Sequence, residues 1–477
     1  MSSPTALSKP QKLVEWLKAN GGHFHTSAEL KVDPQFGLSV FSTSPIKEDD
    51  VLVSCPFELA ITAQLASEAV SEVKGIEEEQ LVWPAGTSKE GEKWNERMRI
   101  GAYLGLHWVH ADVKSDAPWP PALKHKIYLE SLPSPPDLTT PMYFTDSELN
   151  LLQGSNLLGA VEYRKREWKA EQEAVWSVLK EDGLTWERYL AIATYMSSRS
   201  FPSKLLKIPE GQKSQITPAE KRKVDEEEEV SQPVLLPGVD IFNHARNQPI
   251  LWLSSPVQST SAPNSDPIPS ISLVSTQGSD AGVQIFNNYG AKPNEELLLG
   301  YGFVIPSNPE DTVNLRLGKL GNLPEHVTKK LAEKKLDASK RFELRRDGDM
   351  DKELLEVVRI MLNDHDPDHE HEEIDEDDEH ALHAHEEEEM QLELDVLGML
   401  GGMLDDKLAK LQGEATESET GASTDSKAAR AHIREMCEIY RQGQIDILNS
   451  GMDKLTERIE RIEKLLDEGM GGCPCGC

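Results

Sequence analysis

The stretch LPGVDIFNHARNQPILW, residues 236–252, places Asp240, Asn243 and His244 among apolar and β-branched neighbours. Burying a polar side chain costs free energy unless it forms hydrogen bonds, so three such residues this close together need an explanation. One interpretation is a turn, or a core pair whose hydrogen bonds are satisfied. The other is a binding pocket that opens from a β-rich core.

A second stretch, VQIFNNYGAKPNEELLLGYGFVIPSNPEDTV, spans residues 283–313. Its first residues have the composition of a strand. Three short polar or aromatic groups follow: Tyr289-Gly290, Asn294-Glu295 and Tyr301-Gly302-Phe303. A lone tyrosine in a strand is ordinarily structural, because aromatic residues are favoured there. Two Tyr-Gly steps downstream of the polar trio instead favour a shared functional site.

Along the chain up to residue 301, segments with β-strand patterns alternate with a segment of helical patterns. Residues 37–62 are β-rich and punctuated by turns, residues 95–190 have mainly helical patterns, and 235–301 is β-rich again. A proline-rich stretch, 118–141, interrupts the helical part. The sequence therefore predicts two β-rich segments that flank a helical insertion.

From residue 309 onward the pattern is helical, with two interruptions. Residues 363–389 hold fifteen acids and six histidines without a lysine or arginine, and a polar linker covers 413–426. The charged run 363–389 cannot bury enough apolar surface to offset the entropy lost on ordering. We therefore expect it to be disordered. The last long helix is predicted over 428–468, with apolar residues at helical spacing.

Composition disfavours nucleic-acid-binding, disulfide-rich and membrane-spanning proteins. The chain has 477 residues, 38% hydrophobic residues and a formal net charge of −33, which argues against nucleic acid as a partner and favours a basic protein. Five cysteines, three of them in the last five positions, do not make a disulfide framework. No signal peptide and no membrane-spanning stretch is apparent, so we expect a soluble intracellular protein without a membrane partner.

Together the two central stretches resemble the carboxy-terminal half of a SET domain. More narrowly, they resemble the subfamily of the Rubisco large-subunit lysine methyltransferase and the fungal ribosomal-protein and elongation-factor lysine methyltransferases. Three further motifs agree in order and spacing: FGLSVFSTSPIKEDDVLVSCPFELAIT (36–62), KIYLESLPSPPDLTTPMYFTDSELNLLQGSNL (126–157) and SSRSFP (197–202). The resemblance covers roughly residues 12–315.

The resemblance implies an α+β fold with a knotted, β-rich SET core. It implies a SET domain over 12–308 with a helical insertion at about 66–195, and a helical, substrate-binding-like carboxy-terminal domain over 309–362 and 390–468. The tract 363–389 and a Cys/Gly tail at 469–477 lie outside both.

The resemblance also implies transfer of a methyl group from S-adenosyl-L-methionine to a lysine of another protein, with Tyr289 as the catalytic tyrosine. Asn243 would meet the methionine ammonium of the cofactor, the His244 backbone its adenine, and Arg199 its carboxylate. The full set of implied cofactor-binding residues is Phe36, Gly37, Arg199, Asp240, Asn243, His244, Tyr289, Tyr301 and Phe303. The first turn departs from the family, because it has one glycine in Gln35-Phe36-Gly37 where the family usually has two.

The chemistry explains why such residues are needed. A lysine with a pKa near ~10.4 is charged at pH 7, whereas only the neutral amine attacks a methyl group. A narrow, dry channel disfavours the ammonium and aligns the reacting atoms. Arg199 could instead close a surface salt bridge.

Two rival functions stay open at this stage: a protein histidine methyltransferase, and a SET-like scaffold that binds proteins without catalysis. We expect a monomer whose substrate is a basic protein, with ribosomal proteins and elongation factors as the family's common targets. We expect a cytoplasmic location, and also a nuclear one if PAEKRKVD (218–225) is a localisation signal rather than a solvated charge run. No metal site is expected, because the histidines among acids and the Cys-x-Cys-x-Cys tail are weak signals.

Overall fold

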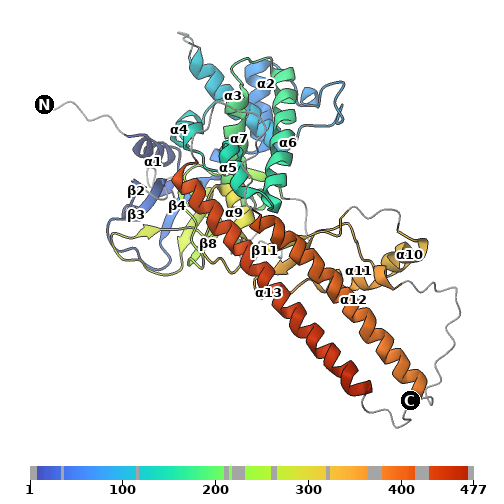
Figure 1. The fold of residues 1–477 in the computed structure, drawn as a ribbon. Helices are drawn as coiled ribbons and strands as arrows, with labels where there is room; N and C mark the ends of the chain where they lie inside the picture. The colour runs from blue at the N-terminus through green and yellow to red at the C-terminus, as the bar shows by residue number, and fades with distance from the viewer. Residues whose placement is uncertain are drawn as a thin grey trace. The chain divides into compact units, whose positions relative to one another are not determined.

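The computed structural model describes residues 8–33, 37–113, 118–208, 214–216, 231–258, 266–318, 323–363, 379–413 and 429–470. The chain divides into two compact units, which are described separately (Figure 1). The first comprises Met1–Met142 and Glu162–Ala291, and the second comprises Tyr143–Val161 and Lys292–Cys477. The predicted mixture of helix and sheet is confirmed.

The first unit contains the larger sheets, and all strand pairs in them are antiparallel. One sheet has the order β1-β4-β9-β8-β6, a second has the order β10-β3-β2, and β5 pairs with β7. The strands are β1 (His23–Phe24), β2 (Ala28–Asp33), β3 (Gly37–Ser42), β4 (Val51–Pro56), β5 (Ser200–Pro202), β6 (Ser214–Ile216), β7 (Pro233–Leu235), β8 (Ile250–Val257), β9 (Ile268–Ser275) and β10 (Gln284–Ile285).

The middle of the five-stranded sheet is covered on both faces. Five of the six side chains of β4 are buried, and so are the last six of β9. Their near-continuous small and apolar sequences, VLVSCP and ISLVS, fit strands without a solvated face.

The helices of the first unit begin at clear capping residues. Thr62, Asn95 and Thr185 each accept a backbone hydrogen bond with the side chain, at the starts of α2, α3 and α7. The helices are α1 (Lys9–Ala19), α2 (Ala63–Lys74), α3 (Glu96–Asp112), α4 (Lys126–Ser131), most of α6 (Asn156–Leu179) and α7 (Trp186–Arg199). α3 packs between α2 and α7 (Figure 1), so it is buried on most sides.

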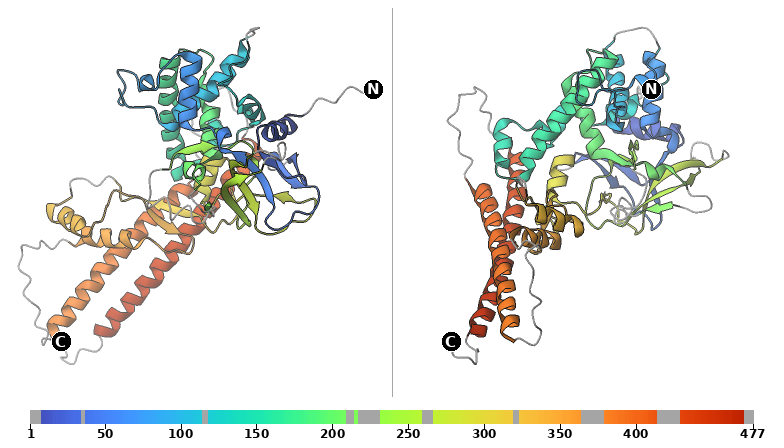
Figure 2. Two further views of the ribbon diagram at one scale, coloured as in Figure 1. Left: turned by 180° about the vertical axis from the view of Figure 1, so that it is seen from behind. Right: turned by 90° about the vertical axis from the view of Figure 1, so that its right-hand side faces the viewer.

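The second unit is mainly helical around one small antiparallel hairpin. Its elements are α5 (Asp146–Leu149), α9 (Asn294–Tyr301), β11 (Thr312–Leu315), α10 (Glu325–Glu333), β12 (Phe342–Arg345), α11 (Lys352–Leu362), α12 (Glu379–Gln412) and α13 (Ala431–Met470). α12 and α13 lie side by side (Figure 2) and run antiparallel, since Arg441 reaches the carbonyl of Leu411 while Arg458 pairs with Glu393. Leucine and valine side chains of α12 fill the seam with isoleucine and leucine of α13.

Part of the acidic tract is ordered, contrary to the prediction. Residues 379–389 form the first turns of α12, so the expectation of disorder is wrong for them, while 364–378 lie outside the described residues. Two i,i+4 pairs contribute, His383 with Glu387 at 3.3 Å and His385 with Glu389 at 3.8 Å. The apolar residues that follow along α12 also anchor this helix against α13.

The division between the units differs from the predicted domain limits. It falls at residue 291 rather than 308, and residues 143–161 of the predicted helical insertion belong to the second unit. Glycine makes one close approach possible there: Gly154 has φ +78°, and a β-carbon on it would lie 2.1 Å from the carbonyl oxygen of Lys410.

No helix in the described part of the chain is long and apolar enough to cross a membrane. The basic stretch 218–225 and the three clustered cysteines of the tail lie outside the described residues. Cys55 and Cys437 are buried free thiols.

Candidate functional site

The stretch 236–252 and the first part of the stretch 283–313, up to Ala291, lie next to each other in the first unit. His244 and Asn287 form a parallel bridge, in which the Asn287 amide donates to the Asn243 carbonyl at 2.7 Å and the Ala245 amide donates to the Asn287 carbonyl at 3.0 Å. The 242–245 segment therefore runs beside the segment that leads into Tyr289. This pairing brings together residues that are some 45 positions apart in the sequence.

Tyr289 is fixed at both ends by this neighbouring segment. Its hydroxyl donates to the carbonyl of Phe242 at 2.8 Å, and its amide donates to Nδ1 of His244 at 3.0 Å. The two rings stack with centroids 5.0 Å apart and an angle of 21°. Because the single hydroxyl proton is committed to Phe242, Tyr289 acts toward any other group as a hydrogen-bond acceptor.

Asn243 connects the same segment to β3. Its amide nitrogen donates to Oγ of Ser39 at 2.8 Å and approaches the Leu38 carbonyl at 3.5 Å. The Ser39 hydroxyl in turn donates to the carbonyl of Gly37 at 3.1 Å. The amide oxygen of Asn243 is therefore the atom suited to accept a hydrogen bond from a cation.

Arg199, the last residue of α7, lies over a buried carboxylate. Its Nη1 donates to the carbonyl of Asp240 at 3.0 Å and lies 3.3 Å from Oδ2 of the same residue. The Asp240 carboxylate is fully buried and also accepts from the hydroxyl of Tyr128 at 2.8 Å and the amide of Gly238 at 3.2 Å. The Arg199 side chain keeps 22% of its surface exposed, and among the described residues only its Nη1 has a hydrogen-bond partner.

The charges of this cluster depend on one another. Burial raises the pKa of Asp240, against the opposing effects of Arg199 and the Tyr128 hydrogen bond. Burial disfavours the charge on Arg199, but Asp240, Tyr128 and Tyr289 outweigh it and raise the pKa of Arg199. Burial raises the pKa of Tyr128 as well, with Asp240 adding to the effect. The guanidinium thus stays positive beside Tyr289.

The remaining predicted residues fall in three places. Gly37 begins β3 with φ +70°, and a β-carbon there would meet no atom within 4 Å, so the backbone beside it is open. Phe36 lies outside the described residues. Tyr301 and Phe303 belong to the second unit, where their rings meet edge to face at 6.2 Å and burial raises the pKa of Tyr301.

Sequence reasoning missed three participants: Tyr128, Ser39 and Phe242. Tyr128 stands 112 positions from its partner Asp240, and Ser39 stands 204 positions from Asn243. Tyr128 does lie in the Tyr-Leu…Leu-Pro landmark of 126–157, which was a usable signal. Within the described residues, no group of three or more histidine, cysteine or acidic side chains is placed to hold a metal ion.

No protein-family model matches the chain. The chain is similar to the ribosomal lysine N-methyltransferase set10 of Schizosaccharomyces pombe, with 31% identity over 329 residues, which is 68% of this chain and 50% of that protein. It is also similar to the actin-histidine N-methyltransferase of Drosophila melanogaster, with 21% identity over 391 residues, or 75% of this chain and 60% of that protein. The matched regions thus span only half to three fifths of these curated relatives.

Solved structures show the same fold over nearly the whole chain. Rubisco LSMT bound to AdoMet has a TM-score of 0.64 at 16% identity and covers 96% of this chain and 94% of its own. The SET domain of LSMT bound to lysine and AdoHcy has a TM-score of 0.62 at 17% identity, with 98% and 97% covered. The chain therefore has the fold of the SET-domain methyltransferases, and its sequence is similar to that of a ribosomal lysine methyltransferase.

Proposed function

We propose that this protein transfers a methyl group from S-adenosylmethionine to a lysine side chain of a protein substrate. The observation that carries the proposal is the fixed position of Tyr289, whose hydroxyl is held by Phe242 beside the guanidinium of Arg199. The match to a ribosomal lysine methyltransferase supports the reaction class, and ribosomal proteins are the substrates we favour.

The first unit offers a donor set that fits the cofactor. Arg199 supplies a half-buried cation for the methionine carboxylate, through Nε and Nη2. Asn243 supplies an amide oxygen for the methionine ammonium, and the open backbone at Gly37 allows a close approach. When bound, S-adenosylmethionine supplies a methyl group on a sulfonium.

In this proposal the protein prepares the amine rather than the methyl group. Tyr289 accepts a hydrogen bond from the lysine nitrogen and orients its lone pair toward the methyl carbon. The positive charge of Arg199 nearby disfavours the ammonium form of the substrate. Asp240 does not touch the reaction: it positions Arg199 from a buried site, and Tyr128 positions Asp240.

The finer features of the family belong to the same proposal. They are the knotted arrangement of the SET core, a role for Tyr301 and Phe303 in walling the lysine channel, and a role for Phe36 near the cofactor. The helices of 309–362 and 390–468 would dock a basic protein substrate. The enzyme would act as a monomer in the cytoplasm, with a nuclear fraction if 218–225 is a signal, and without nucleic acid.

A second candidate, methylation of a protein histidine, is favoured by the similarity to the actin-histidine N-methyltransferase. A scaffold without catalysis is disfavoured, because Tyr289, Asn243, His244 and Arg199 are all present and connected by hydrogen bonds or ring contacts to one framework.

The test is transfer of a labelled methyl group by the recombinant full chain into lysate of cells that lack this protein. Mass spectrometry of the labelled band then identifies the modified residue. We expect methyllysine in one or a few basic proteins. Methylhistidine would select the second candidate, and cofactor binding without any transfer would select the scaffold.

A further inference from the structure

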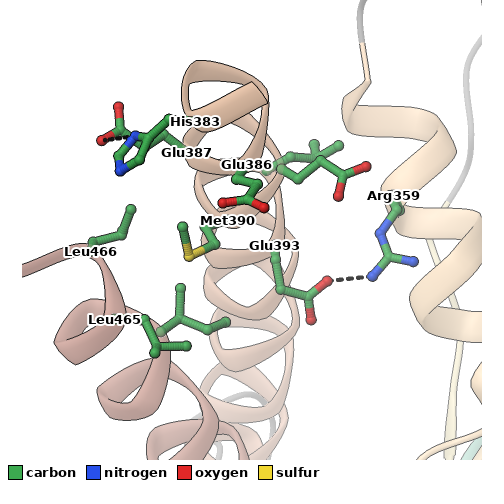
Figure 3. A pocket seen from close by; sticks show the side chains of 11 residues that line it. Arg359, His383, Glu386, Glu387, Met390, Glu393, Leu465 and Leu466 are labelled. Carbon is green, nitrogen blue, oxygen red and sulfur yellow. Dashed lines mark hydrogen bonds and ion pairs between the residues drawn. The ribbon is translucent and has the colours of Figure 1, made fainter. Parts of the chain in front are cut away.

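An open groove lies in the second unit between α11, α12 and α13, near the free end of the long helix pair. It has a volume of about 730 Å³. Figure 3 shows α12 in the centre, with Leu465 and Leu466 of α13 on one side and Arg359 of α11 on the other. Its lining includes Glu386, Glu387 and Glu389 on α12, and Leu465 and Leu466 on α13.

The floor of the groove is an incompletely covered continuation of the α12–α13 seam. Further along the helices the seam is sealed, with Leu397 and Leu404 fully buried. At the groove, Met390 and Leu466 are only partly buried, and Leu465 keeps 52% of its surface exposed. Apolar side chains at helical spacing that no neighbour covers form a surface on which another apolar face can pack.

The rim of the groove is acidic on the α12 side. Arg359 pairs with both Glu393 and Glu356, and Arg458 also pairs with Glu393, so the charges of these two arginines are balanced by two carboxylates. Within the described residues, Glu387 and Glu389 pair with His383 and His385 and with no lysine or arginine. Glu386 forms no ion pair with any residue of the described ranges. The rim therefore keeps a net negative charge.

The acidic rim attracts cationic partners over about one Debye length, roughly 8–10 Å in ordinary buffers. The whole chain is acidic as well, with a formal net charge of −33. Nucleic acid is repelled by the same field, so a basic polypeptide is the partner that matches it.

We propose that this groove binds an amphipathic helix of a partner protein, with leucine-like side chains on the seam and lysine or arginine against Glu386, Glu387 and Glu389. Helices bind grooves of this kind through apolar anchors at positions i, i+3 or i+4, and i+7. The groove would be the part of the proposed docking region that contacts the partner helix. Only the identification of this partner as the methylation substrate rests on the proposed function.

The test measures binding of a synthetic helix to the full chain by fluorescence anisotropy. The probe is a labelled peptide of about 18 residues, long enough to form a helix, made of leucine, lysine and alanine with the leucines on one face. A scrambled peptide of identical composition is the control for charge alone. We expect the amphipathic peptide to bind about tenfold tighter or better, and to weaken as salt is raised.

Variants of the protein locate the binding surface. Glu386→Lys should weaken binding about threefold or more, and Leu465→Gln about tenfold, because one removes an attractive charge and the other an apolar contact. Glu388→Lys and Met399→Gln are matched controls, since both residues are exposed on α12 outside the groove. Both should bind the peptide as the wild type does. Leu465→Ala is a milder second variant if Leu465→Gln lowers helicity by circular dichroism.

The inference is overturned if the scrambled peptide binds equally well, or if the control variants lose binding as much as the groove variants. Retention of wild-type affinity by both Glu386→Lys and Leu465→Ala would also overturn it. The assay contains no S-adenosylmethionine, so it reads peptide capture alone. If the wild-type protein methylates a substrate but does not bind the peptide, the groove proposal is refuted and the proposed function stands. If it binds the peptide but methylates no substrate, the groove proposal stands and the proposed function is refuted.

Discussion

At the scale of single residues, three consecutive positions perform three different tasks. The carbonyl of Phe242 holds the Tyr289 hydroxyl, the Asn243 amide holds β3 through Ser39, and the His244 ring receives the Tyr289 amide and stacks on its ring. One short segment thus sets the relative positions of the tyrosine and of the backbone at Gly37. Small changes here should therefore alter binding and transfer separately.

Asn243→Ala should weaken binding of S-adenosylmethionine without unfolding the first unit. Removing the half-buried amide leaves its hydrogen-bond partners unpaired. This costs about 1–3 kcal/mol of binding free energy, or about ten- to hundredfold in cofactor affinity. Calorimetric titration of the cofactor measures the change. Gln248→Ala is the control and should bind normally, because within the described residues the Gln248 side chain donates only to the nearby carbonyl of Arg246. Equal affinities would place the cofactor elsewhere.

Tyr128→Phe tests the residue that sequence reasoning missed. The change removes one hydroxyl that donates to Asp240, so the buried carboxylate loses a partner while the ring still fills its space. We expect a loss of about 1–3 kcal/mol in the free energy of unfolding and a weaker affinity for the cofactor, because Arg199 loses its support. Tyr163→Phe, at an exposed tyrosine, should change neither quantity. A neutral Tyr128→Phe would show that Asp240 needs no such donor.

The predictable part of the site was the part carried by local sequence. Tyr289, Asn243 and His244 stand in short motifs; the structure places Tyr289 against His244, next to Asn243 in the chain, and their roles in the site stay a prediction. Tyr128 and Ser39 join the site only through the way distant segments pack, which no local pattern records. Asp240 was expected beside the cofactor, and its burial behind Arg199 could not be seen without the fold.

At the scale of elements, the short helix α5 is connected to the rest of the second unit by one buried ion pair. Glu148 has 1% of its side chain exposed and is held by two nitrogens of Arg430, Nε at 2.8 Å and Nη2 at 2.9 Å. These hydrogen bonds lower the pKa of Glu148 to about 2. The sequence around α5 reads as one more helix of the insertion, because nothing local reveals a partner 282 positions away.

Arg430→Gln should destabilise the second unit by about 2–4 kcal/mol at pH 7, since it leaves a buried carboxylate without its cation. The pKa of Glu148 is lower in the folded state than in the unfolded state, so the pair stabilises above about pH 4.5. That contribution is lost as the pH falls toward about 2. The difference between wild type and variant should shrink over the same range in denaturant titrations. Arg434→Gln, at an exposed position four residues further along, in α13, should be neutral. A pH-independent difference between wild type and Arg430→Gln would contradict the account.

At the scale of the whole molecule, the sequence predicted the fold class and the order of its parts better than their limits. Periodicity and motifs reveal which segments are strands and helices. The division at residue 291 depends instead on which contacts α9 makes, such as Asn294 bonded to Asp311 and Ile305. The helical start of α12 was missed because its acids were taken alone, without the apolar seam that follows them.

The first unit should lose stability below neutral pH because two buried histidines must stay neutral. Burial lowers the pKa of His107 to about 4 and that of His125 to about 3, and Nε2 of His107 has no partner within the described residues. Both values are below that of an unfolded histidine, so stability is complete above about pH 6.5 and falls as the pH drops toward 4 and 3. The expected loss at pH 5 is about 2 kcal/mol for each histidine.

Denaturant unfolding at pH 7.5 and pH 5 measures that loss. In His107→Leu it should be smaller by about 2 kcal/mol, because the leucine has no proton to bind. His432→Leu, at an exposed histidine of the second unit, is the control and should keep the full pH dependence. An unchanged dependence in His107→Leu would show that other groups control acid stability.

The most direct test of the account as a whole is methyl transfer by Tyr289→Phe. The substitution removes only the hydroxyl that Phe242 holds, and the ring still stacks on His244. We predict that transfer from S-adenosylmethionine to the protein substrate falls by about 10²–10⁴-fold, while cofactor affinity stays within about threefold, because the hydroxyl acts on the amine alone. Transfer at a near wild-type rate would contradict the central claim.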